Sequence, residues 1–457
     1  MDSGEREKIL RTYGKARELE DVVSKIIMHN QRFVTMMDTN EIYHYDSGIY
    51  RKNGDALIRQ ETEKMLVDVR VSYLSTCHLS GEIIGHIQRN TFKERNGVEP
   101  PLNLLCLQNG ILDINAMQLL PFTPDRFFVA KLPVGYDPIA RCPNFEKFLN
   151  DVLSKNDVPI IQELFGYCLY RDYPVQKIVM FLGEGSNGKS TILNVLEALI
   201  GRNNCSNLPL QQLTDGRFAV ANLYGKFVNK FADLDSFDLE QTGVLKMLVG
   251  NDTFEADRKF KETINFRNYA KMVFSCNTLP RTKDRTDAFY RRWIIIPFMK
   301  KFEGANCDIH LLEKLTTPEE LSGILNYSLI GLKRLLEQGA FTGTRTTEEI
   351  RETYDRLSDP IKAFKLDMLY TSAEAWIEKS RLYAAYVSYC NDKVIPAESK
   401  IKFSKRLVEE IRIHDYFRLI NGQQRECWMG VKLKDNDNTK STVNEQCKLT
   451  DPVEELI

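Results

Sequence analysis

Residues 177–200 read Lys-Ile-Val-Met-Phe-Leu (177–182), Gly-Glu-Gly-Ser-Asn-Gly-Lys-Ser (183–190) and Thr-Ile-Leu-Asn-Val-Leu-Glu-Ala-Leu-Ile (191–200). The first piece is a compact apolar run that suits a buried strand. The last piece has apolar residues at helical spacing and stops at Gly201. The middle piece is a full match to G-x-x-x-x-G-K-[ST]. A strand, a glycine-rich loop and a helix in this order predict an α/β core with a phosphate-binding loop.

Each residue type in this loop has a chemical reason to be there. The glycines let the backbone wrap closely and turn its N–H groups toward phosphate oxygens at a helix amino terminus. Lys189 would reach the β- and γ-phosphates of ATP, and the Ser190 hydroxyl would ligate Mg²⁺. The alternative is a glycine-rich turn with a surface lysine, which the flanking strand and helix disfavour. The predicted ATP-binding residues are Gly183, Glu184, Gly185, Ser186, Asn187, Gly188, Lys189, Ser190 and Thr191.

Two later strands end on polar residues. Lys226-Phe-Val-Asn-Lys-Phe-Ala ends on Asp233, with Asp235 two residues on, and either carboxylate could hold Mg²⁺ and align water. Ala270-Lys-Met-Val-Phe-Ser-Cys ends on Asn277, whose amide could orient the attacking water or touch the γ-phosphate. The competing interpretations are solvated turn positions for the aspartates and a turn-capping residue for Asn277.

Two short clusters are cationic. Asp257-Arg258-Lys259-Phe260-Lys261 lies between two β-like runs, which predicts a hairpin tip that touches a nucleic-acid backbone and stacks on sugar or base. Arg291-Arg292 precedes the apolar run Trp293–Phe298, so a strand would hold both guanidinium groups at its edge. Such an arginine can act as a finger on a neighbouring subunit's nucleotide. A solvated charge run and a structural salt bridge are the respective alternatives.

The composition limits the possible classes of protein. The chain has 457 residues, 62 Lys+Arg and 63 Asp+Glu, so nucleic acid would have to be held by local clusters rather than by a uniformly basic surface. It shows neither a membrane span nor a secretory signal, which favours a soluble protein of the host cytoplasm. The ten cysteines form no CxxC pair, so reduced thiols are expected and no zinc site is predicted.

The pattern along the chain predicts about three domains joined by short connections. Asp46-Ser47-Gly48 and Asn421-Gly422 are hairpin signals, and a helix is expected to carry Trp376 through Tyr389. The expected parts are an α/β domain (1–142), a helical collar (143–174), an ATPase (175–340), a linker (341–373), a winged helix (374–433) and a disordered tail (434–457).

The order of these motifs resembles the superfamily 3 helicases, in the branch of phage, plasmid and large-DNA-virus primase-helicases. The resemblance is close over about Phe145 to Phe302 and looser on both sides. It is carried by Gly-Glu-Gly-Ser-Asn-Gly-Lys-Ser-Thr (183–191), Leu-Tyr-Gly-Lys-Phe (223–227), Ala-Asp-Leu-Asp (232–235), Leu-Val-Gly-Asn-Asp (248–252), Phe-Ser-Cys-Asn-Thr-Leu-Pro (274–280) and Asp-Ala-Phe-Tyr-Arg-Arg-Trp (287–293).

The resemblance implies an AAA+ type ATPase that uses ATP and Mg²⁺, assembles as a ring, usually a hexamer, and translocates 3′ to 5′ on single-stranded DNA. It places Arg292 where the family has its arginine finger, and Lys259 and Phe260 where papillomavirus-type relatives have a DNA-gripping hairpin. Many relatives have a glutamate in the second acidic motif, so the catalytic base stays open between Asp233 and Asp235. No acidic and histidine pattern of a primase is evident in the first hundred residues, so priming is not predicted.

The leading hypothesis is a replicative DNA helicase that acts on single-stranded and forked DNA beside a primase or polymerase of the same replicon. A second hypothesis is an initiator or loader that recognises an origin through Lys400, Lys402, Lys405 and Arg406. A third is an RNA helicase.

Overall fold

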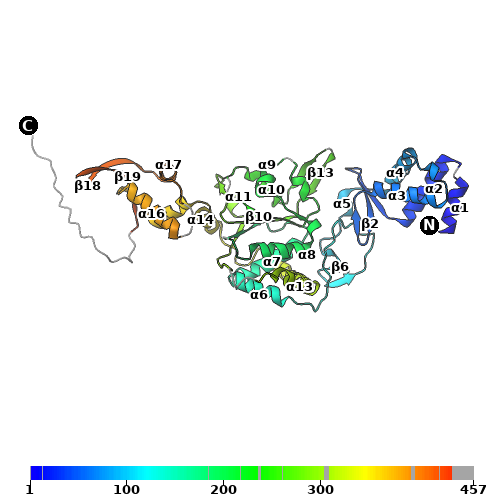
Figure 1. Ribbon diagram of the computed structural model, residues 1–457, viewed down its shortest axis with the longest axis horizontal. Helices are drawn as coiled ribbons and strands as arrows, with labels where there is room; N and C mark the ends of the chain where they lie inside the picture. Colours follow the sequence, from blue (N-terminus) through cyan, green and yellow to red (C-terminus); the bar gives the residue numbers. More distant parts are fainter. Residues whose placement is uncertain are drawn as a thin grey trace, which may run out of the picture. The chain divides into compact units, whose positions relative to one another are not determined.

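The computed structural model has two compact units, Met1–Arg351 and Glu352–Ile457 (Figure 1). The boundary between them lies inside the predicted linker. The described residues are 2–12, 14–183, 185–216, 218–234, 238–259, 261–302, 308–392, 397–420 and 422–434. The predicted disordered tail therefore lies outside the described residues, apart from Lys434.

The amino-terminal part of the first unit is mixed α/β. Its helices pack around an apolar core that includes Ile9, Val23, Ile58 and Ile83, and β1 pairs antiparallel with β2 and parallel with β4. The predicted hairpin at Asp46 is confirmed, because Asp46 pairs with Ile49. The elements are α1 (Ser3–Thr12), α2 (Ala16–Asn30), β1 (Phe33–Met36), β2 (Ile42–Asp46), β3 (Ile49–Arg51), α3 (Gly54–Asp68), η1 (Ser72–Leu74), α4 (Cys77–Thr91), β4 (Phe92–Lys93), α5 (Arg95–Val98), β5 (Leu104–Leu107), β6 (Gly110–Asp113) and β7 (Gln118–Leu120).

A parallel sheet forms the centre of the first unit. In the described part of the chain its strand order is β16-β8-β14-β10-β9, and each neighbouring pair runs parallel. Both β8 and β14 are buried along their whole length, as expected when helices cover both faces of a sheet. Figure 1 shows α7, α8 and α13 on one side of β10, and α9 and α10 on the other. The strands are β8 (Ile178–Leu182), β9 (Cys205–Ser206), β10 (Val228–Leu234), β14 (Lys271–Cys276) and β16 (Trp293–Pro297).

The helices and smaller strands around this sheet begin and end at recognisable signals. Helix α13 starts after Thr317, whose hydroxyl accepts from the Glu320 N–H, and ends at Gly339, which has φ +67°. These elements are α6 (Pro143–Val152), α7 (Val158–Leu169), α8 (Lys189–Ile200), η2 (Arg202–Asn204), α9 (Leu210–Asp215), η3 (Val220–Leu223), β11 (Asp238–Leu239), α10 (Thr242–Leu248), β12 (Thr253–Arg258), β13 (Lys261–Arg267), β15 (Arg281–Thr282), α11 (Asp287–Tyr290), α12 (Leu311–Leu315) and α13 (Pro318–Gln338).

Helices α7 and α13 approach each other closely because glycines lie where they cross. A Cβ atom at Gly166 would lie 2.2 Å from the Ser328 carbonyl oxygen, and one at Gly331 would lie 2.3 Å from the Gln162 carbonyl oxygen. Side chains at these positions would separate the two helices. The predicted collar helix α7 is thereby joined to the helix that follows the sheet in sequence.

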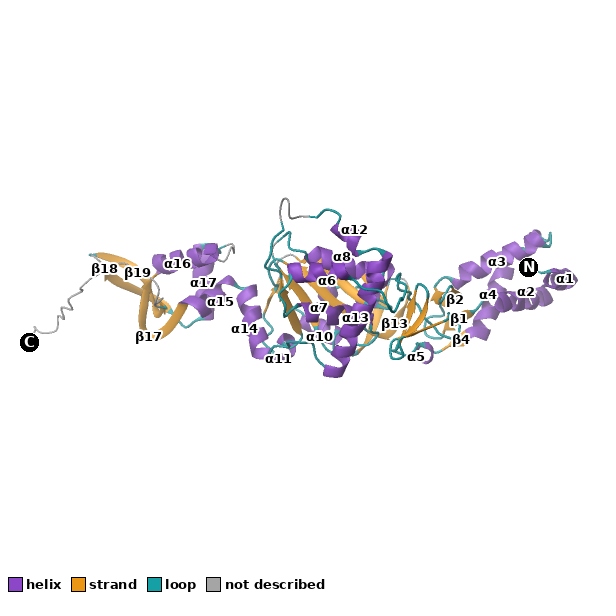
Figure 2. Ribbon diagram, turned by 90° about the horizontal axis from the view of Figure 1, so that it is seen from below, coloured by secondary structure: helices purple, strands orange, loops and turns teal. Residues whose placement is uncertain are grey.

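The second unit has helices on one face of a three-stranded antiparallel sheet of order β17-β19-β18 (Figure 2). The prediction that a helix carries Trp376 is wrong: Trp376 lies in β17, paired with Met429, and α16 begins at Lys379. The hairpin signal at Gly422 is confirmed, since Ile420 pairs with Gln423, while Asn421 lies outside the described residues. The elements are α14 (Thr347–Ser358), which crosses the boundary between the units, α15 (Pro360–Met368), β17 (Leu369–Glu378), α16 (Lys379–Asp392), α17 (Lys400–Glu410), β18 (His414–Ile420) and β19 (Gln423–Leu433).

Part of the predicted linker belongs to the core of this second unit. Ile361 and Phe364 of α15 are fully buried among residues of α16, α17 and the sheet. The physical reason is that three strands and two helices leave an apolar face uncovered, and α15 covers it.

Candidate active site

The glycine-rich loop lies between β8 and α8, as its sequence predicts. Gly188 caps α8 with φ +91°, a conformation that favours glycine, and a Cβ there would lie 2.9 Å from Val152 of α6. A Cβ at Gly183 would lie 2.5 Å from both the Asn187 side chain and the Phe298 carbonyl oxygen. Glu184 lies outside the described residues. Larger side chains at Gly183 and Gly188 would collide with these neighbours, whereas a Cβ at Gly185 would meet nothing within 4 Å.

Lys189 lies in the cradle that this loop forms. Its side chain is buried, with 3 % of the residue exposed, and Nζ donates to the Gly183 carbonyl oxygen and, at 3.1 Å, to Asn187 Oδ1. Desolvation lowers the pKa of the lysine, and the negative charges of Asp233 and Cys276 oppose that shift. The ammonium group is thus held at a helix amino terminus by acceptors of the loop itself, which phosphate oxygens could replace.

Asp233 reaches the same edge of the sheet through a bulge in β10. Phe231 pairs with Phe274 and Leu234 pairs with Cys276, so two residues of β10 oppose Ser275 alone. Asp233 has φ +55°, its N–H donates to Ser275 Oγ at 3.2 Å, and its side chain is exposed. Asp235 lies outside the described residues, so the choice between the two carboxylates stays a prediction.

Asn277 and Ser190 lie at this edge as well. Cys276 pairs with Leu182, so Asn277, the next residue, is exposed beside the start of the loop. Ser190 is exposed on the first turn of α8. The predicted residues Lys189, Ser190, Asp233 and Asn277 therefore meet at the carboxyl ends of parallel strands, where α/β sheets bind ligands.

A cavity of about 560 Å³ opens beside the loop, between α6 and α12. Apolar side chains of both helices line it together with Thr191 of α8, and Asn144, Lys147 and Asp151 of α6 supply polar groups. Its lining also includes Phe148, Val152, Ser186, Gly188, Phe302 and Leu312. Asp308 and Lys314 also line the cavity, so apolar and polar residues contribute to it in similar number. Apolar surface combined with polar groups, next to an anion cradle, suits a phosphorylated organic ligand.

Arg291 and Arg292 lie at the opposite edge of the sheet. Trp293 pairs in parallel with Ile178, the first residue of β8, so Arg292 lies level with Lys177, six strand steps or about 20 Å from the start of the loop at Gly183. Arg292 is buried, and among the described residues its Nε has no hydrogen-bond partner. Burial lowers the pKa of Arg292, the Arg291 cation adds to this, and Asp252 opposes it. Arg291 is exposed and donates to Gln176. Within one chain, the structure does not bring these arginines to the loop.

The predicted hairpin is confirmed as β12 and β13. Arg258 pairs with Lys261 across its end, and Lys259 lies in the turn. Lys259 is exposed, whereas Phe260 and the side chain of Lys261 lie outside the described residues. Arg258 Nη1 donates to Glu41 Oε1 at 2.9 Å, and the side chains of both residues are mostly covered. One of the four predicted nucleic-acid contacts is therefore engaged with the amino-terminal part.

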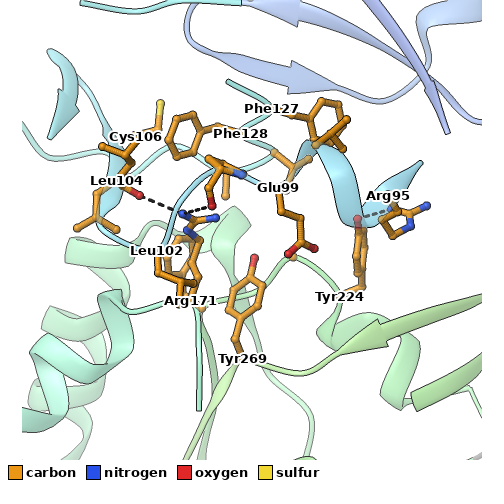
Figure 3. A pocket seen from close by; sticks show the side chains of 17 residues that line it. Arg95, Glu99, Leu102, Leu104, Cys106, Phe127, Phe128, Arg171, Tyr224 and Tyr269 are labelled. Atoms are coloured by element: carbon orange, nitrogen blue, oxygen red, sulfur yellow. Dashed lines mark hydrogen bonds between the residues drawn. The ribbon is translucent and has the colours of Figure 1, made fainter. Parts of the chain in front are cut away.

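A second contact, absent from the sequence prediction, joins the amino-terminal part to the base of the same hairpin. Arg95 forms a bidentate pair with Asp38 at 2.7 and 2.9 Å. It also donates to the Tyr224 hydroxyl (Figure 3). The Tyr224 ring in turn packs edge-on against Phe266 of β13, with ring centroids 5.5 Å apart. No sequence signal could have joined Arg95 to Tyr224, because 129 positions separate them.

Figure 3 shows the small cavity at this junction, where Arg171 donates to the Leu104 carbonyl oxygen at 3.2 Å and Tyr269 and Glu99 point into the space. Burial lowers the pKa of Arg171 and raises the pKa of Tyr269. The cavity measures about 50 Å³, which is enough for a few water molecules rather than for an organic ligand.

In the described part of the chain, no helix is long and apolar enough to cross a bilayer. The same residues contain no group of three His, Cys, Asp or Glu that could hold a metal ion, and the eight described cysteines are free.

The chain is similar to proteins of large DNA viruses that are named as putative helicases. A family model described as "Family of unknown function (DUF5906)" matches residues 181–292, and one described as "D5 N terminal like" matches residues 88–154. The chain is 26 % identical over 211 residues to Putative helicase L207/L206 of Acanthamoeba polyphaga mimivirus, covering 44 % of this chain and 22 % of the relative. It is 23 % identical over 345 residues to Putative helicase 121R of Invertebrate iridescent virus 3, covering 64 % of this chain and 35 % of the relative.

A solved structure of the NrS-1 C terminal region aligns with 89 % of this chain and 99 % of its own length, at 12 % identity and a TM-score of 0.47. The chain spans between 22 and 35 % of the length of the two viral relatives described above. It has a mixed α/β fold and is similar in sequence to proteins named as putative helicases of large DNA viruses.

Proposed function

We propose that this chain is the motor of a replicative DNA helicase: an AAA+ type ATPase that forms a ring and translocates 3′ to 5′ on single-stranded DNA, in the cytoplasm of the host of a virus, phage or plasmid. The observation that carries the proposal is the buried Lys189 ammonium in a glycine cradle, at the same sheet edge as Asp233 and Asn277. The strand order places β14 between β8 and β10, so the parallel strands that end at the loop, at Asn277 and at Asp233 are neighbours in the sheet.

The residues of the loop fit a nucleoside triphosphate with Mg²⁺. Lys189 would exchange its bonds to Gly183 and Asn187 for oxygens of the β- and γ-phosphates. Ser190 and Asp233 would hold the cation, with Asp235 as the alternative carboxylate, and Asn277 would orient the attacking water. Mg²⁺, when bound, supplies positive charge that offsets the charge building up on the phosphates. The cavity between α6 and α12 would take the nucleobase.

The position of Arg292 supports a ring. The loop and Arg292 lie at opposite edges of one sheet, so a head-to-tail arrangement would bring the loop of one subunit to Arg292 of the next. Burial would keep the guanidinium group in place until the neighbouring nucleotide arrives. The proposed partners are single-stranded and forked DNA, and a primase or polymerase of the same replicon.

The initiator alternative relies on cations of α17, and two of them already have acidic partners. Arg406 pairs with Asp359 and Glu398, and Lys402 pairs with Glu398 at 2.9 Å. These pairs favour the helicase over recognition of an origin by this helix. Only an experiment can distinguish the RNA helicase alternative from the DNA helicase.

Strand separation and ATP hydrolysis test the proposal directly. Wild type should hydrolyse ATP faster with single-stranded DNA than with RNA, and should open a fork with a 3′ tail in preference to a 5′ tail. Lys189→Ala should lose both activities by at least about a hundredfold, whereas Lys333→Ala, an exposed lysine on α13, should keep them. A wild type that hydrolyses ATP yet separates neither fork would refute the helicase and favour the initiator.

A mixing experiment tests the arginine across the subunit seam. Arg292→Ala and Lys189→Ala should each be inactive alone. When they are mixed in equal amounts and allowed to exchange subunits, about a quarter of the seams combine an intact loop with an intact arginine, so about a quarter of the hydrolysis should return. No recovery, with both variants folded and assembled, would contradict action across the seam.

A further inference from the structure

The sheet of the second unit has one face that its own helices leave uncovered. Ile377, Trp428 and Val431 point into the core beneath α15, α16 and α17. Side chains alternate along a strand, so Trp376 and Met429, the neighbours of Ile377 and Trp428, point the other way. A register shift beside Gly430, which has φ +104°, interrupts the alternation in β19, so Lys432, the neighbour of Val431, points to this second side as well. We call this second side the outer face.

All three strands contribute to the outer face: β17 supplies aromatic rings, β19 supplies cations, and β18 supplies both. Trp376 of β17 pairs with Met429 of β19, and the same side of the sheet continues onto β18 through the pairs of Cys427 with Tyr416 and of Arg425 with Arg418. The relevant side chains are Tyr370, Trp376, Tyr416, Arg418, Arg425 and Lys432.

The cations lie over the rings. The guanidinium carbon of Arg418 lies 4.1 Å from the centroid of the Trp376 ring, and Lys432 Nζ lies 5.4 Å from that of Tyr370. Tyr370, Tyr416, Arg418, Arg425 and Lys432 are exposed, and Trp376 is half-buried. Cations packed on aromatic faces are held in place with little mobility, which makes them suitable for binding a polymer of phosphates and flat bases.

The acidic residues described near this face offset only part of the positive charge of its arginines and lysine. Arg418 and Arg425 face each other directly across the strands, an arrangement that is unfavourable without an anion. Glu378 lies 3.8 Å from Arg425 Nη1, and the exposed Glu374 is on the same strand. No ion pair with an acid is seen for Arg418 or Lys432 in the described residues, so both can accept a phosphate.

We propose that the outer face binds single-stranded nucleic acid, with phosphates on Arg418, Arg425 and Lys432 and bases stacked on the aromatic rings. Interleaved rings and cations on a sheet are the means by which single strands are bound without regard to sequence. Duplex DNA hides its base faces and would leave these rings unused. The surface is separate from the β12–β13 hairpin and needs no ATP, so it is an addition to the proposed motor rather than a part of it.

The test measures binding of oligothymidylate and oligouridylate, without nucleotide, to the full chain carrying Lys259→Ala, which weakens the hairpin contact. Arg418→Gln combined with Lys432→Gln should weaken binding by at least about tenfold and lower the salt dependence by about 1.4 in the log–log slope, because two phosphate contacts are lost. The oligothymidylate and oligouridylate arms show whether DNA or RNA binds more tightly.

The matched control removes the same charge from the helical face: Lys400→Gln with Lys405→Gln, two exposed residues of α17. This pair should leave single-strand binding within about twofold of the parent. Equal melting temperatures show that both double variants are folded. Unchanged affinity and slope for the outer-face pair, or a greater loss for the α17 pair, would overturn the proposal, as would tighter binding of a duplex than of either single strand.

Discussion

Glu41 and Arg258 form an ion pair with a 2.9 Å Nη1–Oε1 distance, although 217 positions separate them in the chain. Glu41 directly precedes β2, and Arg258 ends β12 beside the turn that carries Lys259. The side chains are 17 % and 14 % exposed, so the pair is shielded more than a typical surface ion pair. The amino-terminal part thus holds the end of the hairpin that we propose to contact DNA.

Removing this carboxylate should make the hairpin available to DNA. In Glu41→Gln, Arg258 loses this carboxylate and can pair with a phosphate in its place, so affinity for single-stranded DNA should rise by roughly threefold to tenfold with a steeper salt dependence. Fluorescence anisotropy of a labelled oligonucleotide at several salt concentrations measures both. Glu82→Gln makes the same charge change at an exposed site on α4 and should have no such effect. Weaker binding in Glu41→Gln would indicate that the pair supports the hairpin instead.

The bulge that places Asp233 depends on Ser275. Ser275 is fully buried and its Oγ accepts from the Asp233 N–H at 3.2 Å. Ser275→Ala should lower kcat for ATP about tenfold, because the backbone of Asp233 loses its only described side-chain acceptor, while ATP affinity, which depends on Lys189, should change little. Steady-state kinetics with a direct ATP-binding measurement separate the two effects. Ser328→Ala removes another fully buried hydroxyl, on α13, and should leave kcat unchanged.

Lys271 should make stability depend on pH. It is almost fully buried at the start of β14, and Nζ donates to the carbonyl oxygens of Asp172 at 2.8 Å and Tyr269 at 2.9 Å. Burial lowers its pKa from 10.5 to about 7. Between these two values the unfolded chain binds the proton that the folded chain has released, so stability rises with pH.

A comparison of wild type with Lys271→Met separates the contribution of Lys271 to the pH dependence of stability from that of the other titrating groups. The free energy of unfolding of the wild type minus that of Lys271→Met should grow by roughly 2 kcal/mol from about pH 7 to about pH 9. Denaturant unfolding at each pH measures the difference. A difference that stays constant over this range would mean that the carbonyl oxygens keep the ammonium group charged.

The crossing of α7 and α13 should not tolerate a methyl group. In Gly166→Ala the new Cβ would meet two backbone atoms, the Ser328 carbonyl oxygen at 2.2 Å and the Leu332 nitrogen at 2.6 Å, neither of which can move independently. We expect a loss of about 1–3 kcal/mol in the free energy of unfolding. Gly81→Ala, in α4 with nothing within 4 Å of the new Cβ, should gain about 0.5–1 kcal/mol. Equal effects of the two substitutions would show that the helices can separate without cost.

Short-range patterns in the sequence predict much of the local structure. The strand, loop and helix of residues 177–200, the β12–β13 hairpin and the turn at Gly422 each depend on residues within a few positions of one another, and the structure confirms them. Aromatic residues at helical spacing follow Trp376 and predict a helix there. The pairing of Trp376 with Met429, more than fifty positions away, overrides that local preference.

The residue types in the loop and at the strand ends were sufficient to nominate Lys189, Asp233 and Asn277, because parallel strands bring their carboxyl ends to one edge whatever the details of packing. Their relation to the arginines and to the amino-terminal part depended on the folded chain. Strand order and register placed Arg292 at the far edge of the sheet, and side-chain packing paired Glu41 with Arg258 and Arg95 with Tyr224. Those contacts join residues a hundred or more positions apart, so they arise from long-range packing, which no local pattern encodes.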